Sequence, residues 1–205
     1  MDRYTRLYLI RHGQVENYES GVLNGHNNVG LSTLGLRQLE TVASRLKDDD
    51  IAAVYSSDLQ RARKGAEFIA RHHGLMPVVD ASLRELNFGL WTGASFMEIE
   101  AAFPGALEER SQQLADYRPP GGESLGDLQG RVMPVLRKAL ADHAGAVIVF
   151  VAHGGVNRVI LADALGLDPD NFYSIEQDYG CVNIVDYFSD LAVVKLMNGR
   201  VDRDF

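Results

Sequence analysis

The segment Val147-Ile148-Val149-Phe150-Val151 is the feature that most limits how this chain can fold. It is continuously apolar and mostly β-branched, which is typical of a strand buried on both faces of a sheet. Such strands occur in parallel sheets whose two faces are covered by helices. Shorter runs at 7–10 and 51–55 also have the character of strands, and a helical pattern separates them. The sequence therefore predicts an α/β fold with a mainly parallel central sheet and helices on both faces.

Helical patterns fill the stretches between the strands. Four longer helices are predicted from capping residues and from apolar residues that recur at helical spacing. They begin after Ser32, after a capping box formed by Ser57 and Gln60, after Ser124 with Asp127, and at about residue 155, the last ending before Gly166. Further strand-like runs lie at 77–79, 181–187 and 191–196. Strands and helices thus alternate over most of the chain.

Length and composition favour one domain. The chain has 205 residues, of which 46% are hydrophobic and 23% charged, and these values are ordinary for a soluble globular protein. No internal repeat or low-complexity tract divides it, so residues 1–205 are interpreted as a single domain. Residues 86–122 have less regular patterning and end in Pro119-Pro120-Gly121-Gly122. They are predicted to form a cover over the functional site, with one or two short helices.

Charge and cysteine content narrow the class of partner and the compartment. The net charge of −8 disfavours binding to nucleic acid or to an anionic membrane surface. No apolar stretch approaches the ~20 residues of a membrane span. The apolar run before Arg11 is too short for the core of a signal peptide. The single cysteine, Cys181, suits a reducing compartment. These features predict a cytoplasmic protein that binds anions only at a local basic site.

Three predicted strand ends carry residues suited to holding an anion. The first strand ends in Arg11-His12-Gly13, the second leads into a helix that carries Arg61, and the third ends in His153-Gly154-Gly155. The carboxyl ends of parallel strands lie at one edge of a sheet, where the ligands of α/β proteins bind. Two arginines, two histidines and a glycine-rich helix N-terminus at this edge predict a phosphate site.

Each of these residues also has a plain structural interpretation. A histidine after a strand is more often structural than catalytic, and an arginine on a helix is usually a solvated surface charge. Arg61 fits the second interpretation poorly, because the first turn of a helix carries positive partial charge and disfavours a cation. A bound anion beside Arg61 would remove that conflict, so the combined pattern favours phosphate binding.

Five ordered motifs resemble those of the histidine phosphatase superfamily, whose members share a phosphoglycerate-mutase-like fold. They are Leu9-Ile10-Arg11-His12-Gly13, Ser56-Ser57-Asp58-Leu59-Gln60-Arg61-Ala62, Leu83-Arg84-Glu85-Leu86-Asn87-Phe88-Gly89-Leu90-Trp91, Pro120-Gly121-Gly122-Glu123-Ser124 and Val151-Ala152-His153-Gly154-Gly155. The fourth resembles a loop of the family's small phosphatases, which include α-ribazole phosphatase. Three positions depart from the family pattern: Val15 and Gly65 replace a frequent threonine, and Thr92 replaces a frequent glutamate.

The resemblance implies a role for each site residue. His12 would be the nucleophile that forms a phosphohistidine, since a neutral imidazole is nucleophilic. Arg11 and Arg61 would clamp the phosphoryl oxygens, and a protonated His153 would stabilise the phosphoryl group during its transfer. Glu85 would protonate the leaving oxygen and then activate water. Further substrate contacts are expected from Asn17, Asn24, Gly25 and Gly154. No metal ion or cofactor is expected.

Other hydrolase chemistries find weaker support in the sequence. Gly122-Glu123-Ser124-Leu125-Gly126 fits the G-x-S-x-G elbow of serine hydrolases, and Asp142 and His153 follow in the required order. That elbow needs a strand before it, whereas prolines and glycines precede it here, so Ser124 is better explained as a helix cap. Cys181 lacks the arginine six residues later that a cysteine phosphatase needs. No cluster of carboxylates or histidines indicates a metal phosphatase.

The sequence therefore predicts an enzyme, a phosphomonoester hydrolase that acts on a small phosphorylated metabolite, with α-ribazole-5′-phosphate as one candidate. The short chain and the loop at 120–124 favour a phosphatase over a phosphoglycerate mutase of the same fold, which needs more cover to exclude water. A non-catalytic phosphate-binding member of the family is the remaining alternative. The oligomeric state stays open, with a homodimer as one option.

Overall fold

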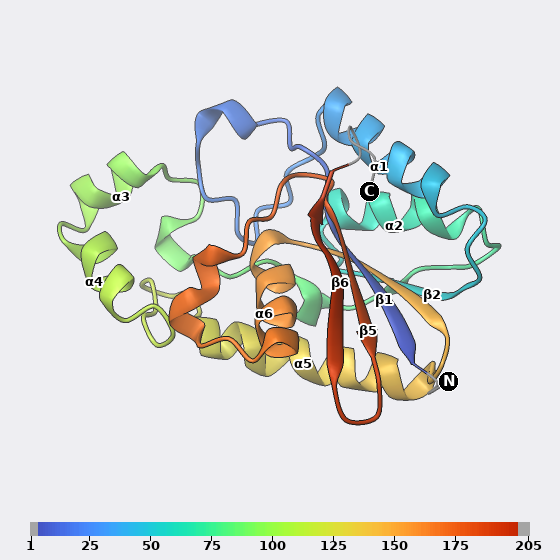
Figure 1. The fold of residues 1–205 in the computed structure, drawn as a ribbon. Helices are drawn as coiled ribbons and strands as arrows, with labels where there is room; N and C mark the ends of the chain where they lie inside the picture. The colour runs from blue at the N-terminus through green and yellow to red at the C-terminus, as the bar shows by residue number, and fades with distance from the viewer. Residues whose placement is uncertain (1–3, 201–205) are drawn as a thin grey trace.

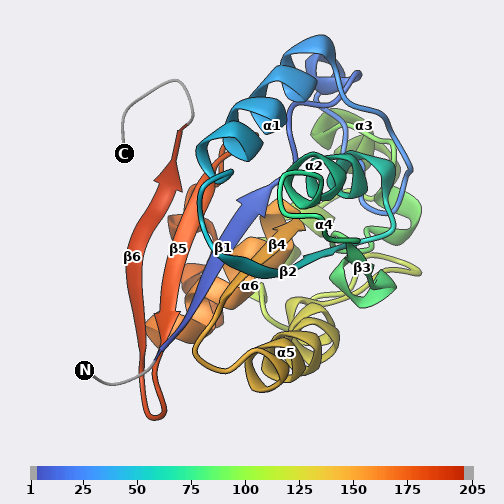
Figure 2. The same ribbon diagram turned by 90° about the vertical axis from the view of Figure 1, so that its right-hand side faces the viewer.

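A sheet of six strands forms the centre of the computed structural model, which describes residues 4–200 (Figures 1 and 2). The strand order is β3-β2-β4-β1-β5-β6. The strands are β1 (Thr5–Arg11), β2 (Ile51–Ser56), β3 (Val78–Val79), β4 (Val147–Ala152), β5 (Val182–Tyr187) and β6 (Ala192–Gly199). Strands β1 to β4 are parallel to one another, whereas β5 is antiparallel to both of its neighbours. The prediction of a mainly parallel sheet is confirmed.

Helices cover both faces of this sheet, as the sequence predicts. The longer helices are α1 (Thr33–Arg45), α2 (Gln60–Ala70), α5 (Leu125–Asp142) and α6 (Gly154–Leu165). Figure 2 shows α1 and α2 on one face and α5 and α6 on the other. Across residues 4–200, no helix is both long and apolar enough to cross a membrane.

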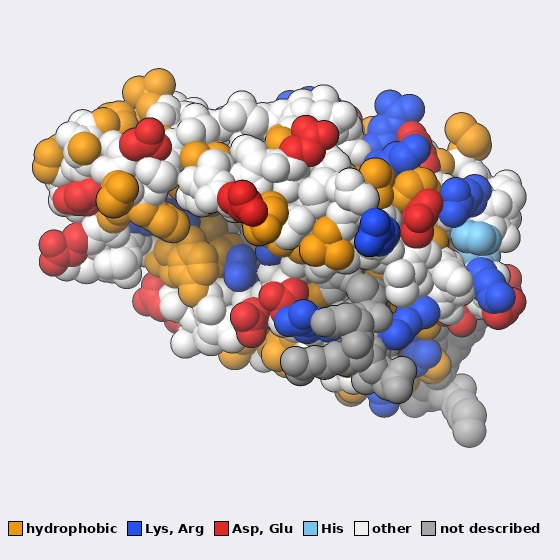
Figure 3. Space-filling model, turned by 90° about the horizontal axis from the view of Figure 1, so that it is seen from above, with side chains coloured by type: hydrophobic (Ala, Val, Ile, Leu, Met, Phe, Trp, Pro, Cys, Tyr) orange, Lys and Arg blue, Asp and Glu red, His pale blue; other side chains and the backbone are white. Residues whose placement is uncertain are grey.

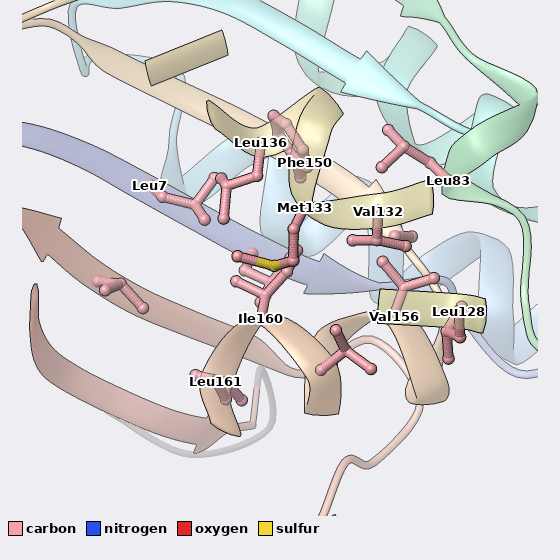
Figure 4. Packing of buried hydrophobic residues seen from close by; sticks show 14 of the residues in the cluster. Leu7, Leu83, Leu128, Val132, Met133, Leu136, Phe150, Val156, Ile160 and Leu161 are labelled. Carbon is pink, nitrogen blue, oxygen red and sulfur yellow. The ribbon is translucent and has the colours of Figure 1, made fainter. Parts of the chain in front are cut away.

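The apolar strand β4 separates two hydrophobic cores. Side chains alternate between the two faces along a strand, and Ile148 and Phe150 accordingly pack with residues of α5 and α6. Figure 4 shows Phe150 among side chains of these two helices. Val149 and Val151 pack on the opposite face with residues of α1 and α2. All four of these side chains are fully buried. Because each face has its own core, this strand is apolar at every position.

Serine caps begin two of the helices where the sequence places them. The Ser32 hydroxyl accepts a hydrogen bond from a first-turn amide of α1, and Ser124 forms the predicted capping box with Asp127. The expected capping box at Ser57 is wrong, because α2 begins three residues later and has no side-chain cap. The Ser57 hydroxyl lies 2.7 Å from a ring nitrogen of His153 instead. This buried tertiary partner takes the place of the local one.

Residues 86–122 contain two short helices, α3 (Phe96–Ala102) and α4 (Ala106–Gln112), which agrees with the prediction for this region. Figure 1 shows both helices beyond the end of the sheet. The Trp91 ring is fully buried, and its centre lies 6.5 Å from that of Phe103 and 5.6 Å from that of Tyr117. This aromatic cluster packs three separate parts of the segment 86–122 against one another. Short 3-10 helices occupy η1 (Tyr18–Ser20), η2 (Ala81–Leu83), η3 (Gly89–Trp91) and η4 (Pro169–Ser174).

Candidate active site

A cavity of about 220 Å³ lies where the carboxyl ends of β1 and β4 meet the start of α6. Of the residues predicted for the site, Arg11, His12, Asn24, Gly25, Arg61, Glu85 and Gly154 line it. The other lining residues are Val22, Leu23, Leu86, Phe88, Phe96, Arg110, Gly155, Arg158, Phe172, Tyr173 and Tyr179. Figure 3 shows basic side chains beside hydrophobic ones in a hollow on the upper face of the molecule. The volume is below the ~300–1,000 Å³ of drug-sized pockets, so it suits a small metabolite.

Two glycines bring the end of β1 against the start of α1 and fix the backbone that carries His12. A Cβ atom at Gly13 would lie 2.2 Å from the Gly35 carbonyl oxygen. A Cβ atom at Gly35 would lie 2.0 Å from the Gln14 carbonyl oxygen. Neither position therefore accepts a larger residue without a backbone shift. Close backbone packing explains the glycine of the Arg-His-Gly motif.

The His12 ring is held in the tautomer whose Nε2 atom carries a lone pair. Its Nδ1 atom lies 2.8 Å from the Gly13 carbonyl oxygen, which can only accept a hydrogen bond, so Nδ1 carries the proton. Burial, followed by the charges of Arg61 and Arg11, lowers the pKa of His12 well below its usual value of 6.5. The ring is therefore neutral at pH 7, as a nucleophile requires.

His153 is completely buried at the N-terminus of α6. Its Nε2 atom is bonded to the Ser57 hydroxyl, and its Nδ1 atom has no hydrogen-bond partner among residues 4–200. Its ring centre lies 5.1 Å from that of His12 in an edge-on arrangement. Burial and the charges of Arg61, His12 and Arg11 lower the pKa of His153 well below 6.5. The protonated form expected from the sequence therefore needs an added negative charge nearby.

Two arginines supply positive charge to the cavity, and backbone carbonyls hold both. Arg61 is 1% exposed and donates to the carbonyl oxygens of Asn27 and Gly25 at 2.6 and 2.7 Å. Burial lowers the pKa of Arg61 to about 10, which leaves it cationic at neutral pH. Arg11 donates to the Gln177 carbonyl oxygen at 2.5 Å. The Nε–H groups of both arginines are buried and lack a hydrogen-bond partner within the described part of the chain.

The Glu85 carboxylate lies against the N-terminus of α6. It accepts hydrogen bonds from the Gly155 amide at 3.0 Å and from the Leu86 amide at 2.9 Å. The carbonyl oxygen of Glu85 accepts a hydrogen bond from Arg131 and lies 2.8 Å from a ring nitrogen of His26. These contacts hold both the backbone and the carboxylate of Glu85 at the cavity wall.

The remaining candidate contact residues are placed differently. Asn24, Gly25 and Gly154 line the cavity, whereas Asn17 is not among the lining residues. The side chains of Asn17 and Asn24 exchange two hydrogen bonds, of 2.8 and 3.1 Å, so Asn17 orients Asn24. The Gly25 carbonyl oxygen accepts a hydrogen bond from Arg61. Gly154 is the first residue of α6.

Three residues belong to the site by geometry although the sequence did not assign them to it. The Ser57 hydroxyl is hydrogen-bonded to His153. Ser57 follows the last residue of β2, and this position at a strand end could have indicated that it belongs to the site. Arg158 lines the cavity one helical turn after Gly154, so helical spacing could have indicated it. Arg110 reaches the cavity from α4, and nothing in its local sequence indicates this.

This arrangement suits phosphoryl chemistry better than the competing hydrolase chemistries. Cationic groups around a neutral imidazole can bind a phosphoryl dianion and stabilise its transfer. The Ser124 hydroxyl is engaged in the capping box of α5, and Ser124 does not line the cavity. Burial raises the pKa of the Cys181 thiol to about 11, so this thiol stays protonated. The residues that the structure describes contain no group of three or more His, Cys, Asp or Glu side chains placed to hold a metal ion.

Known proteins share this sequence pattern. The profile of the histidine phosphatase superfamily (branch 1) matches residues 7–200. A bifunctional protein of Mycobacterium tuberculosis is 37% identical over 196 residues, which are 95% of this chain but 54% of that protein. The chain thus spans about half the length of that relative. A glucosyl-3-phosphoglycerate phosphatase of Mycolicibacterium vanbaalenii is 35% identical over 178 residues, which cover 83% of this chain and 78% of that protein.

Solved structures share the fold. A mycobacterial glucosyl-3-phosphoglycerate phosphatase superposes with a TM-score of 0.86 at 28% identity, covering 96% of this chain and 100% of that one. The α-ribazole phosphatase of Shigella flexneri gives a TM-score of 0.86 at 24% identity, covering 95% and 96%, which establishes a common fold. The profile match over nearly the whole chain agrees with the five motifs found in the sequence. The chain therefore belongs to the histidine phosphatase superfamily, branch 1.

Proposed function

We propose that this protein is a phosphomonoester hydrolase that works through a phosphohistidine on His12. The observation that carries the proposal is the state of the His12 ring, which is neutral and bonded through Nδ1 to the Gly13 carbonyl oxygen. Nε2 is therefore the nucleophilic atom. Arg11 and Arg61 supply the positive charge that holds a phosphoryl dianion beside this ring. Membership of the histidine phosphatase superfamily supports the same assignment.

In the first step, Nε2 of His12 attacks the phosphorus atom of the bound ester. The bond between phosphorus and the ester oxygen breaks, and a protonated Glu85 gives its proton to that oxygen so that an alcohol leaves. The guanidinium groups of Arg11 and Arg61, which line the cavity, donate to the phosphoryl oxygens, where charge develops. The bound dianion favours protonation of His153, which then donates from Nδ1.

The second step regenerates the free enzyme. Glu85, now a carboxylate, takes a proton from water while the water oxygen attacks the phosphorus atom of the phosphohistidine. The N–P bond breaks, its electron pair returns to Nε2 of His12, and inorganic phosphate leaves. Hydrogen bonds from the Gly155 and Leu86 amides hold the Glu85 carboxylate in place for this step.

The substrate that we propose is a small phosphorylated metabolite. The cavity of about 220 Å³ holds the phosphoryl end of such a substrate, and its leaving group can extend past the exposed rim residues Phe96 and Tyr173. The loop at 120–124 resembles that of small phosphatases and supports α-ribazole-5′-phosphate as one candidate. The relative from Mycolicibacterium vanbaalenii supports glucosyl-3-phosphoglycerate as another. Two arginines and His153 supply the positive field that a metal ion gives other phosphatases, so we propose metal-independent catalysis.

Hydrolysis of p-nitrophenyl phosphate by chelator-treated protein tests this function. We expect continued release of nitrophenolate after chelation, and a loss of about 10³-fold or more in His12→Ala, because the nucleophile is gone. Ser124→Asn keeps a helix cap and should retain activity. Undiminished turnover in His12→Ala would contradict the mechanism, as would a loss on chelation that a divalent cation restores. No turnover at all would favour a non-catalytic phosphate-binding protein.

A further inference from the structure

Two arginines without a role in the proposed chemistry line the outer part of the cavity. Arg158 projects from α6 and Arg110 from α4, and both guanidinium groups lie near the Tyr173 ring. Each guanidinium carbon is 5.6 Å from the centre of that ring. Arg110 also donates to the Tyr173 hydroxyl at 2.6 Å. Elements that are distant in the chain thus bring two cations to one aromatic platform.

Arg158 connects this platform with the phosphoryl end of the cavity. A Cβ atom at Gly154 would lie 3.3 Å from Nη1 of Arg158 and 3.5 Å from Nε of Arg11, so both guanidiniums approach the same small residue. Arg158 donates from Nε to the Ile175 carbonyl oxygen at 2.7 Å, which fixes the side chain. Within residues 4–200 neither Nη group of Arg158 forms a hydrogen bond, so both remain for a ligand.

A bound phosphoryl group alone does not neutralise the charged side chains that line the cavity. Four arginines and one glutamate line it. Neither Arg110 nor Arg158 has a carboxylate within 4.0 Å in the described part of the chain. In the proposed first step Glu85 is protonated and carries no charge, so a phosphoryl dianion offsets only two of the four positive charges. A further anionic group on the substrate would offset a third.

We infer that the substrate carries a second anionic group on its leaving-group side and that Arg158 and Arg110 bind it. A carboxylate is the smallest group that offers the two oxygens a guanidinium fork accepts, which suits a cavity of about 220 Å³. Leu23, Phe88 and Phe96 line the cavity and provide apolar walls for a short carbon chain. This inference rests on the proposed function and narrows its substrate class to carboxylate-bearing phosphomonoesters.

Matched substrate pairs test the second anion site. The pairs are 3-phosphoglycerate with glycerol 3-phosphate, and 2-phosphoglycolate with ethyl phosphate, so that each pair differs by a carboxylate and the two pairs differ in length. We expect kcat/KM to favour the carboxylate in at least one pair by about tenfold or more, because charge-assisted hydrogen bonds are strong. Arg110→Gln and Arg158→Gln should each remove most of that preference. The exposed Arg137 on α5 provides a control, and Arg137→Gln should leave the preference unchanged.

The result separates this inference from the proposed function. If both pairs show less than a threefold preference, or if neither arginine substitution reduces it, the second anion site is wrong. Hydrolysis of ethyl phosphate and glycerol 3-phosphate that depends on His12 would still support the hydrolase. Arg110 is half-buried on a short surface helix, so Arg110→Gln tests the site even if Arg158→Gln fails to fold.

Discussion

His12 and His153 lie against each other in one buried cluster, yet their hydrogen-bond partners differ. His12 donates a hydrogen bond from Nδ1 to the Gly13 carbonyl oxygen and keeps Nε2 as an acceptor. His153 uses Nε2 for the Ser57 hydroxyl and keeps Nδ1 without a partner among the described residues. This difference fits the proposed roles, in which Nε2 of His12 attacks phosphorus and a protonated His153 donates to the phosphoryl group.

Burial of two neutral histidines predicts that stability depends on pH. The pKa values of His12 and His153 are lowered in the folded protein, so the unfolded chain binds more protons than the folded one below about pH 6.5. The free energy of unfolding should therefore fall as the pH drops below 6.5, by up to about 1.4 kcal/mol per pH unit for each histidine. Urea denaturation between pH 7.5 and 5.5 measures this slope.

His12→Asn should flatten that slope, because the proton that His12 takes up on unfolding is lost. His72 is exposed after the end of α2, and His72→Asn serves as the control that leaves the slope unchanged. A slope that is the same in wild-type protein and His12→Asn would show that His12 is not held neutral by the fold.

The acid role of Glu85 predicts a dependence on the leaving group. With an alkyl phosphate, Glu85→Gln should lower kcat by about 10²–10⁴-fold, because the alkoxide needs a proton. With p-nitrophenyl phosphate the loss should be much smaller, since nitrophenolate leaves unaided. Arg61→Ala should lower turnover of both substrates similarly, by about 10²–10³-fold, because both present the same phosphoryl group. If Glu85→Gln lowers kcat equally for the two substrates, Glu85 is not the general acid.

At the scale of single residues, the sequence predicts what lies at strand ends and little of what reaches the site from elsewhere. Arg11, His12 and His153 follow apolar strands, so topology alone brings them to one edge. Arg110 arrives from α4, whose position depends on tertiary packing of residues 86–122. A pattern in the local sequence carries no information about such a contact.

At the scale of elements, the start of α6 positions both Glu85 and the arginines. A Cβ atom at Gly155 would lie 2.3 Å from Oε1 of Glu85, so Gly155→Ala must displace the carboxylate. A Cβ atom at Gly154 meets side-chain nitrogens of Arg158 and Arg11 at 3.3 and 3.5 Å, which needs only a small adjustment. These neighbouring glycines therefore give a matched pair of substitutions.

Gly155→Ala should reduce turnover of an alkyl phosphate at least tenfold more than Gly154→Ala. The thermal midpoint of both variants should stay near that of the wild type, because alanine is favourable within a helix. Steady-state kinetics and thermal unfolding measure the two effects. If Gly155→Ala retains full activity on the alkyl phosphate, the position of the Glu85 carboxylate is not important for catalysis.

Elements with strong patterns were predictable, and the exceptions have physical causes. β4 is apolar at every position because both of its faces are covered, and Ser124 caps α5 because its partner Asp127 is local. Ser57 has the same local pattern, but the buried ring of His153 lies 2.7 Å from its hydroxyl, and α2 begins without that cap. Tertiary partners of this kind override capping signals.

At the scale of the whole molecule, access of water separates hydrolysis from mutase chemistry. A mutase must shield its phosphohistidine from water until the acceptor is bound. Phe96 and Tyr173 line the cavity, and they are 55% and 53% exposed, so the cavity meets solvent. With 3-phosphoglycerate and its bisphosphate, we expect release of inorganic phosphate and little exchange of the 2- and 3-isomers. Isomerisation that exceeds phosphate release a hundredfold would identify a mutase.

In the proposed mechanism, phosphorus becomes bonded to His12 during turnover. The most direct measurement is a rapid quench after brief exposure to a phosphomonoester with a radiolabelled phosphoryl group, followed by mapping of the labelled peptide. The label should be acid-labile, stable to base, located on His12 and absent from His12→Ala. Label on Ser124 or on any other side chain would contradict the account, as would His12→Ala protein that hydrolyses substrate at the wild-type rate.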